Sequence, residues 1–328
     1  MLKRTFAAAL AASACALGAG PAAHAAPAYP SKPIRMVVPF APGGTADIIG
    51  RLFAAQLGKE LGATVVVENR AGAGGSIGAR YVADAAPDGY TLLLASSSTH
   101  GTNPAVYKQL SYDAVTDFTP ITQIVTVPGV LSVNKDFPAR TLKELIAVTA
   151  ANPEKYSYAS SGAGGLGNLA MELMKSMTGA RIMHISYRGA GPAFTDVISG
   201  QVSMIWEPVP ASLPYLKSGQ TRAIAIAAER RSPELPDTST FKEAGLAGYE
   251  ADAWNGFLGP KGLPADVLQT LHAASVRALQ DPDTQAKLAA LGGTVVANSP
   301  EAFQRVVAGD VAKWKKVAAE AGISLDGN

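Results

Sequence analysis

The stretch that decides the fold is VVPFAPGGTAD, residues 37–47. The end of an apolar strand leads through Gly43 and Gly44 into a helical pattern. Glycines at such a junction let backbone N–H groups approach an anion, and the helix N-terminus adds a partial positive charge. A second junction of the same kind, VVVENRAGAGGS at residues 65–76, follows directly. The chain is therefore expected to bind a small anion through backbone N–H groups, without a Lys or Arg side chain.

Short β-branched runs alternate with longer helical runs over most of the chain, which is typical of βαβ units and a mostly parallel sheet. The predicted strands are 34–39, 64–68, 91–95, 129–134, 156–159, 182–187, 202–205 and 223–227. The predicted helices are 45–61, 76–85, 142–152, 166–178 and 192–199, followed by 264–280, 282–291 and 299–321. Together they indicate an α/β protein.

Two extended segments, 120–130 and 248–259, have the pattern of crossings between domains. If both cross, the middle of the chain is an inserted domain. We therefore expect domain I to comprise residues 26–124 and 251–328, and domain II to comprise residues 125–250. A two-lobed protein of this kind offers helix N-termini from both lobes to a ligand in the cleft.

The first 25 residues have the pattern of an export signal. Lys3 and Arg4 precede an apolar stretch that is too short to span a bilayer, and Ala23-His24-Ala25 fits a cleavage site after Ala25. A buried N-terminal helix is the alternative. Lipidation at Cys15 is not expected, because Ala12 stands where a lipobox prefers Leu. Periplasmic location follows from this pattern.

The predicted mature chain has no net charge and no cysteine. Of the 28 Lys and Arg residues, two lie in the signal, which leaves 26 against 26 Asp and Glu residues, and Cys15 is the only cysteine. Neutral charge without a basic run argues against nucleic acid as a partner. The missing cysteine excludes disulfides and thiol chemistry from the mature chain.

Four helix starts are rich in glycine or small residues: 43–45, 74–76, 160–165 and 189–192. One such loop is ordinary turn chemistry. Four in one chain, each after a strand, favour anion binding at a cleft.

The segment 162–167 matches G-x-G-x-x-G in full, after a strand and at a helix start. A dinucleotide site also needs an acid at the end of the next strand, and that place holds Tyr187, Arg188 and Gly189. Arg188 leaves open an NADP-linked oxidoreductase as a rival hypothesis. No P-loop occurs, and an exported protein has little access to a soluble nicotinamide, so no cofactor is expected.

Catalysis finds little support in the sequence. His100, His184 and His272 stand singly, without metal-ligand spacing, and there is no nucleophile elbow. The loop that carries Ser97 and His100 is interpreted as a wall of the ligand site, with a capped turn as the alternative. Trp206 could close the cleft over a ligand or pack in the core, and Glu207 could receive a ligand ammonium group or hold the hinge.

The ordered motifs resemble the substrate-binding proteins of tripartite tricarboxylate transporters, the Bug (Bordetella uptake gene) family. The motifs are PFAPGG with Asp47, ENRAGAGG, His100 with Asn103-Pro104, YASSG, YRGAGPA with Asp196, GQV, RSPELPD, EAG, WNG and residues 317–323. Two places differ from the pattern of many members. Asn168 stands where they carry His, and Trp206-Glu207-Pro208 stands where they carry Phe-Asp.

The resemblance implies a type II periplasmic-binding-protein ("Venus flytrap") fold that binds a small carboxylate, with no enzymatic activity. It implies that Phe40, Pro42, Gly43, Gly44, Thr45 and Asp47 form one side of the site. It places Ser160, Ser161, Gly162, Ala163 and Gly164 on the facing side, with Arg188 and Gly189 nearby. With Ser97, His100, Trp206 and Glu207, these residues are the predicted ligand contacts, and no metal is expected.

The expected ligand is a dicarboxylate, a tricarboxylate, an aromatic acid or an acidic amino acid. The expected partners are the membrane components of a tripartite tricarboxylate transporter. A sensor kinase is the alternative, in which the protein signals the ligand's presence instead of delivering it. A monomer is expected.

Overall fold

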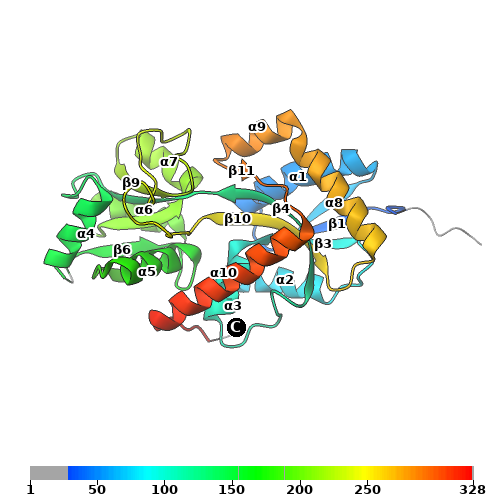
Figure 1. The fold of residues 1–328 in the computed structure, drawn as a ribbon, viewed down its shortest axis with the longest axis horizontal. Helices are drawn as coiled ribbons and strands as arrows, with labels where there is room; N and C mark the ends of the chain where they lie inside the picture. Colours follow the sequence, from blue (N-terminus) through cyan, green and yellow to red (C-terminus); the bar gives the residue numbers. More distant parts are fainter. Residues whose placement is uncertain (1–28, 154, 188, 327–328) are drawn as a thin grey trace, which may run out of the picture.

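A computed structural model describes residues 29–153, 155–187 and 189–326. Two β-sheets with their helices lie side by side along the long axis of the molecule (Figure 1). We call the six-stranded sheet and its helices lobe I, and the five-stranded sheet and its helices lobe II. The predicted export signal lies outside the described residues.

Lobe I has the strand order β11-β4-β10-β3-β1-β2. Its strands are β1 (Ile34–Val38), β2 (Val65–Asn69), β3 (Thr91–Ser96), β4 (Phe118–Val127), β10 (Ala253–Pro260) and β11 (Thr294–Val295). Its helices are α1 (Thr45–Leu61), α2 (Ser76–Ala83), α3 (Asn103–Val106), α8 (Ala265–Gln280), α9 (Pro282–Ala290) and α10 (Pro300–Glu320), with short helical turns η1 (Ala73–Gly75) and η2 (Ser98–Thr102).

Lobe II has the strand order β7-β6-β8-β5-β9. Its strands are β5 (Gly129–Asn134), β6 (Ser157–Ser160), β7 (Met183–Ser186), β8 (Met204–Pro208) and β9 (Thr221–Ala227). Its helices are α4 (Leu142–Ala151), α5 (Leu166–Thr178), α6 (Ala190–Ser199) and α7 (Val209–Lys217).

Both sheets are mixed, so the expectation of a mostly parallel sheet is wrong. β1 is parallel to β2 and β3, and β6 is parallel to β7 and β8. β10 runs antiparallel to both β3 and β4, and β5 runs antiparallel to β8 and β9. β4 leads into β5 through Pro128 alone, and β10 follows β9 without a helix between them. Parallel neighbours need a crossover connection, usually a helix, and these two connections have none.

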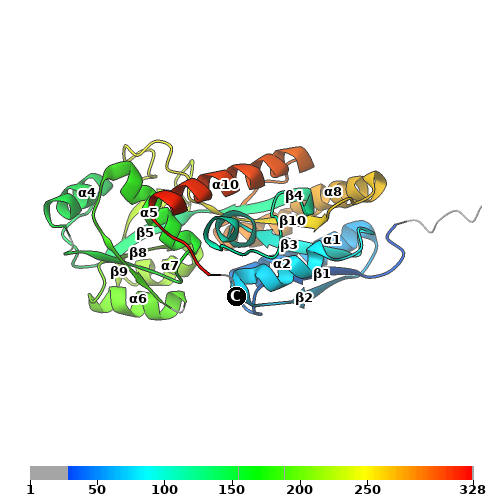
Figure 2. The same cartoon turned by 90° about the horizontal axis from the view of Figure 1, so that it is seen from below.

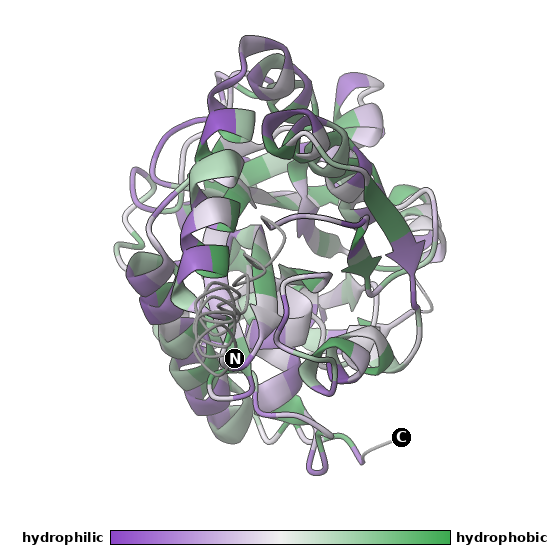
Figure 3. Cartoon of the chain, turned by 90° about the vertical axis from the view of Figure 1, so that its right-hand side faces the viewer, coloured by the Kyte–Doolittle hydropathy of each residue, from purple (hydrophilic) through white to green (hydrophobic). Residues whose placement is uncertain are grey.

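Helix α1 shows how the sequence pattern forms these elements. Ile49, Phe53 and Leu57 recur at helical spacing and are fully buried, and the Phe53 ring packs edge-to-face on Phe257, with ring centroids 5.3 Å apart. Gly62 ends the helix at φ 61°, where a residue with a Cβ would be strained. Apolar residues gather on the strands and the inward faces of the helices (Figure 3).

Helix α10 runs along both lobes (Figure 2). Phe303 and Val307 belong to a core cluster of lobe I. Trp314, Val317 and Ala318, further along the same helix, belong to the main core of lobe II. One helix therefore takes part in the hydrophobic cores of both lobes.

The predicted crossings are strands rather than loops. β4 ends at Val127, β5 begins at Gly129, and β10 covers most of the second predicted crossing. The domain boundaries at 124/125 and 250/251 stay a prediction. No helix among the described residues has the length and apolar character that a membrane span requires.

Candidate ligand-binding site

The first predicted side of the ligand site is the loop between β1 and α1. Pro42, Gly43, Gly44 and Thr45 are exposed, and Phe40 is half-buried. Gly44 is the N-cap of α1, and no side chain among the described residues caps this helix start. The first backbone N–H groups of α1 therefore lack the usual side-chain acceptor, which makes this end of the helix suited to an anion.

Asp47 braces this loop from inside. Its Oδ2 accepts a hydrogen bond from the Gly43 N–H at 2.9 Å, and its Oδ1 accepts one from Asn69 Nδ2 at 2.8 Å. The Arg51 guanidinium, Gly43 N–H and Asn69 amide lower the Asp47 pKa to about 2. Because Asp47 is buried and its two oxygens already have partners, the geometry gives it a positioning role in place of the predicted ligand contact.

The Gly43 N–H is likewise already used by Asp47. Asn69 also donates to the Phe40 carbonyl oxygen at 3.0 Å, which ties the end of β2 to the loop. The backbone N–H groups that remain for a ligand on this side of the site are then those of Gly44 and Thr45.

The second glycine junction packs behind the first. Gly75 adopts φ 93°, and a Cβ there would lie 2.6 Å from Thr99 Cγ2 and 3.2 Å from Phe40 Cζ. Asn103 Nδ2 donates to the Gly74 carbonyl oxygen at 3.0 Å. These contacts connect the first loop to the turn after β3.

His100 lies inside the core of lobe I and not on a ligand-facing wall. Its ring is fully buried, 4.6 Å from the Phe118 ring centroid to centroid, and its Nδ1 lies 2.9 Å from Thr99 Oγ1. Burial lowers its pKa to about 3. Ser97 is also buried. The interpretation of His100 as a wall of the ligand site is therefore wrong, because the helical turn η2 directs its ring towards Tyr112 and Phe118.

The facing loop lies between β6 and α5. Ser161 and Ala163 are exposed, Gly162 is half-buried, and Gly165 is the N-cap of α5 without a side-chain cap among the described residues. Ser160 is buried, and its hydroxyl donates to the Gly162 carbonyl oxygen at 3.0 Å. This helix start therefore resembles that of α1 in chemistry.

A polar chain holds the α5 start in place. The Gly164 N–H donates to Asn168 Oδ1 at 2.9 Å, Asn168 Nδ2 donates to the Tyr158 hydroxyl at 2.6 Å, and that hydroxyl donates to Glu172 at 2.6 Å. Asn168, which stands where many members of the resembled family carry His, thus orients the loop from within the core and has a positioning role.

Gly164 is where the facing loop meets lobe I. It adopts φ 71°, and a Cβ there would lie 2.9 Å from Leu325 Cδ1 and 3.0 Å from Val106 Cγ2. Val106 ends α3, which follows the turn that contacts the first two loops. The structure therefore connects the facing loop, through α3 and η2, to the two glycine loops of lobe I.

His184, which was not among the predicted ligand contacts, supports this loop. Its Nε2 lies 2.7 Å from Ser160 Oγ, and its ring stacks on Tyr158 with centroids 4.8 Å apart. The signal that points to it is the parallel register of β6 and β7, which pairs Tyr158 with His184. Such a register is a property of the sheet and not of the local sequence.

Trp206 is part of the lobe II core and does not close over a ligand. It is fully buried, and a Cβ on Gly129 would lie 1.8 Å from its Cζ2. The Gly167 position approaches its backbone, with a built Cβ 2.6 Å from the Trp206 carbonyl oxygen. The third glycine of the G-x-G-x-x-G match is therefore explained by close packing of α5 on β8.

Glu207, the next residue along β8, faces the loop. The register of parallel β6 and β8 pairs Ala159 with Ile205, so Ser161 and Glu207 continue side by side at the carboxyl ends of the two strands. Burial raises the Glu207 pKa to about 7, against hydrogen bonds from the side chain and backbone of Ser161. Glu207 Oε1 has no partner among the described residues.

Gly189 lies beside the same loop, since its N–H donates to the Ser161 carbonyl oxygen at 3.1 Å. Arg188 lies outside the described residues. Within the described chain, no group of three or more His, Cys, Asp or Glu side chains could hold a metal ion.

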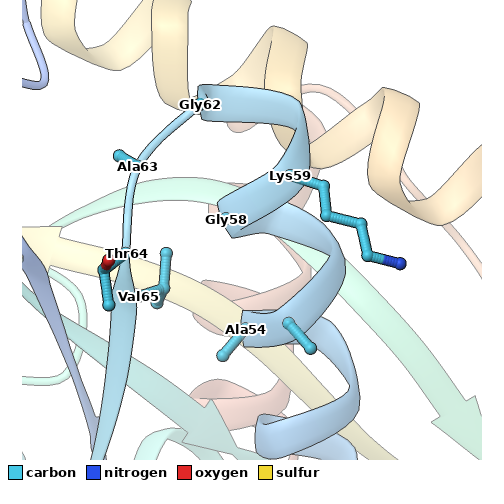
Figure 4. Close-up of a pocket in the computed structure, with 8 residues that line it drawn as sticks. Ala54, Gly58, Lys59, Gly62, Ala63, Thr64 and Val65 are labelled. Atoms are coloured by element: carbon cyan, nitrogen blue, oxygen red, sulfur yellow. The ribbon is translucent and has the colours of Figure 1, made fainter.

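Two surface hollows lie away from these loops. One, of about 450 Å³, is formed by the end of α1 and the start of β2, with Ala54, Gly58 and Thr64 in its lining (Figure 4). A smaller one, of about 260 Å³, lies between Ile77 and Tyr107. Neither is lined by a predicted ligand contact, so the site rests on the loops described above.

Residues 49–323 match the model of TctC, the tripartite tricarboxylate transporter family receptor. This chain belongs to that receptor family. The match agrees with the resemblance to the Bug family, because the chain is 37% identical to BugT of Bordetella pertussis over 90% of this chain and 91% of that protein.

Two solved structures of this family extend the comparison. An R. palustris protein solved with adipate is 37% identical, with a TM-score of 0.79 over 90% of this chain and 99% of its own. MatC of Rhodopseudomonas palustris, solved with bound malate, is 33% identical, with a TM-score of 0.75 over 88% and 99% of the two chains. The expected periplasmic-binding-protein fold is confirmed for this family member.

Proposed function

We propose that this receptor captures a small carboxylate in the periplasm for a tripartite tricarboxylate transporter. The observation that carries the proposal is the pair of helix starts without side-chain caps, at Gly44 in lobe I and Gly165 in lobe II. Each follows the carboxyl end of a strand with parallel neighbours, where α/β sheets bind ligands. Relatives solved with adipate and with malate support the ligand class.

The proposed mechanism is capture by closure. The ligand carboxylate accepts hydrogen bonds from free N–H groups at one helix start and engages the other as the lobes approach. Each charge-assisted bond contributes about 1.5–3 kcal/mol, and the ligand shifts a pre-existing equilibrium between open and closed forms. The closed form is then recognised by the membrane components. Cleavage after Ala25 belongs to the same proposal, and the mass of the exported chain checks it.

Two glycines allow a test that spares the fold. A Cβ at Gly44 would have its nearest neighbour 3.8 Å away, and a Cβ at Gly162 would have none within 4 Å. We expect Gly44→Leu and Gly162→Leu to fold normally and to lose at least tenfold in affinity for the carboxylates that stabilise the wild type in a thermal-shift panel. Isothermal titration measures the change.

Gly309→Leu is the matched control, because Gly309 lies in α10 with open space around its Cα. Unchanged affinity in both loop variants would place the ligand elsewhere. If no dicarboxylate, tricarboxylate, aromatic acid or acidic amino acid stabilises the protein at millimolar concentration, the proposal of carboxylate capture is wrong.

A further inference from the structure

Glu207 is a buried carboxyl group that the fold does not fully satisfy. Glu207 is 7% exposed, and the neighbouring Ser161 lowers its pKa through its side chain and its backbone, against the larger effect of burial. Oε1 has no hydrogen-bond partner among the described residues. A buried acceptor without a donor is costly, so a chain that keeps one is expected to supply the donor from a bound molecule.

The position of Glu207 links it to the predicted ligand site. It lies near the carboxyl end of β8, beside Ser161 in the loop that leads to the helix start of α5. On its other side β5 pairs Val130 with Glu207, and the Val209 N–H donates to the Pro128 carbonyl oxygen at 2.9 Å. Glu207 therefore lies between a helix start without a side-chain cap and the short connection that leads from lobe I into lobe II.

The local charges are those that a zwitterion requires. The α5 start presents backbone N–H groups and the positive end of a helix dipole, which suit a carboxylate. Beside Ser161 in the loop before this helix, Glu207 presents a carboxyl oxygen as a hydrogen-bond acceptor. No charged side chain among the described residues contributes to the shift of its pKa. A plain dicarboxylate would bring a second negative charge towards this carboxyl group, whereas an ammonium group would pair with it.

We infer that Glu207 receives an ammonium group of the ligand, so that this receptor prefers carboxylates that carry an amino group, as acidic amino acids do. The inference deepens the proposed function and rests on it. The raised pKa of Glu207 is consistent with it, because a buried carboxyl group without a cationic partner among the described residues holds its proton until a cation arrives.

Matched ligand pairs test the inference on the wild-type protein. Aspartate and succinate, glutamate and glutarate, and 2-aminoadipate and adipate differ only by the amino group. Isothermal titration at pH 7.5 should show at least one amino acid binding ten times or more tighter than its partner. Equal or tighter binding of every plain dicarboxylate would overturn the inference and leave the proposed function standing. Binding of neither class in any pair would count against the proposed function itself.

Glu207→Gln tests the residue. The amide keeps the shape and loses the negative charge, so the preference for the amino acid should fall to less than about threefold while the plain dicarboxylate keeps or gains affinity. Glu250→Gln is the control, because Glu250 is an exposed carboxylate just before β10 and should change neither ligand's affinity. A full preference retained in Glu207→Gln would show that the ammonium group binds elsewhere.

Discussion

At the residue scale, two buried carboxyl groups lie near the two helix starts, Asp47 in the first turn of α1 and Glu207 in β8 beside the loop before α5, and their pKa values are shifted in opposite directions. Asp47 is surrounded by donors, which lower its pKa to about 2. Glu207 is buried with few donors, and its pKa rises to about 7. The first is therefore a fixed negative brace of the lobe I loop, and the second changes its charge within the range of pH in which bacteria live.

The Glu207 pKa predicts a pH dependence of stability. The folded chain holds this proton more tightly than the unfolded chain, whose pKa is near the ordinary 4.5. The stabilisation is complete below pH 4.5 and is lost as the pH rises to about 7, by up to roughly 3 kcal/mol. Urea denaturation of wild type and Glu207→Gln across pH 4 to 8 measures it.

The difference between the two proteins isolates Glu207, because other titrating groups such as His100 are common to both. The variant should gain stability relative to the wild type as the pH rises. A difference that stays flat across this range would show that Glu207 titrates as an ordinary carboxyl group.

Asp47→Ala is expected to destabilise the protein by about 1–3 kcal/mol, because it leaves the Gly43 N–H and the Asn69 amide without their acceptor. Equilibrium denaturation measures the loss. Asp283→Ala removes an exposed pair with Lys287 in α9 and should change stability by less than about 0.5 kcal/mol. Equal losses in the two variants would contradict the bracing role of Asp47.

At the scale of elements, close glycine contacts fix how α5 and β5 pack on β8. Gly129 leaves no room for a Cβ against the Trp206 ring, whereas Gly309 in α10 has open space and a helical backbone. We expect Gly129→Ala to cost about 1–3 kcal/mol by overpacking and Gly309→Ala to gain about 0.4–1 kcal/mol. Thermal and urea unfolding of the pair measure both signs. A neutral Gly129→Ala would mean that Trp206 shifts freely.

The sequence predicted the helices with clear apolar spacing well, and it missed a helix that contains internal proline. Helices α1 and α5 have their predicted bounds, because their apolar spacing and terminal glycines agree. Helix α7 was missed because Pro210 and Pro214 lie within it. Strands β4 and β10 were interpreted as extended crossings between domains, because their pairing is decided by contacts far apart in the chain.

The candidate site divides in the same way. The glycine loops are local signals, so their exposed positions at Gly44 and Gly162 could be predicted. Whether a side chain faces the loop or the core depends on sheet register and on neighbouring aromatic rings. His100 and Trp206 were therefore assigned to the site from sequence although they pack in the core, and His184 was left out although it bonds to Ser160.

At the scale of the whole molecule, α10 joins two cores. Phe303 packs in lobe I and Trp314 in lobe II, so unfolding one lobe exposes a face of the helix that serves the other. We expect one cooperative transition. Trp206 reports on lobe II and Trp254 on lobe I. Two single-tryptophan variants, each carrying Trp314→Phe and keeping either Trp206 or Trp254, should show the same urea midpoint by fluorescence. An earlier midpoint for Trp206 would show that lobe II unfolds alone.

The contact of Leu325 with both lobes has a practical consequence. Leu325 pairs with Tyr107 of lobe I and lies against Gly164 of the facing loop, and the neighbouring Asp326 is exposed. A fluorescent dye on a cysteine at position 326 would thus lie beside the contact between the lobes that the proposed closure would rearrange. Cys15, the only native cysteine, lies in the predicted export signal, so labelling would need no further substitution. The chain is in this sense a ready scaffold for an optical sensor of its own ligand.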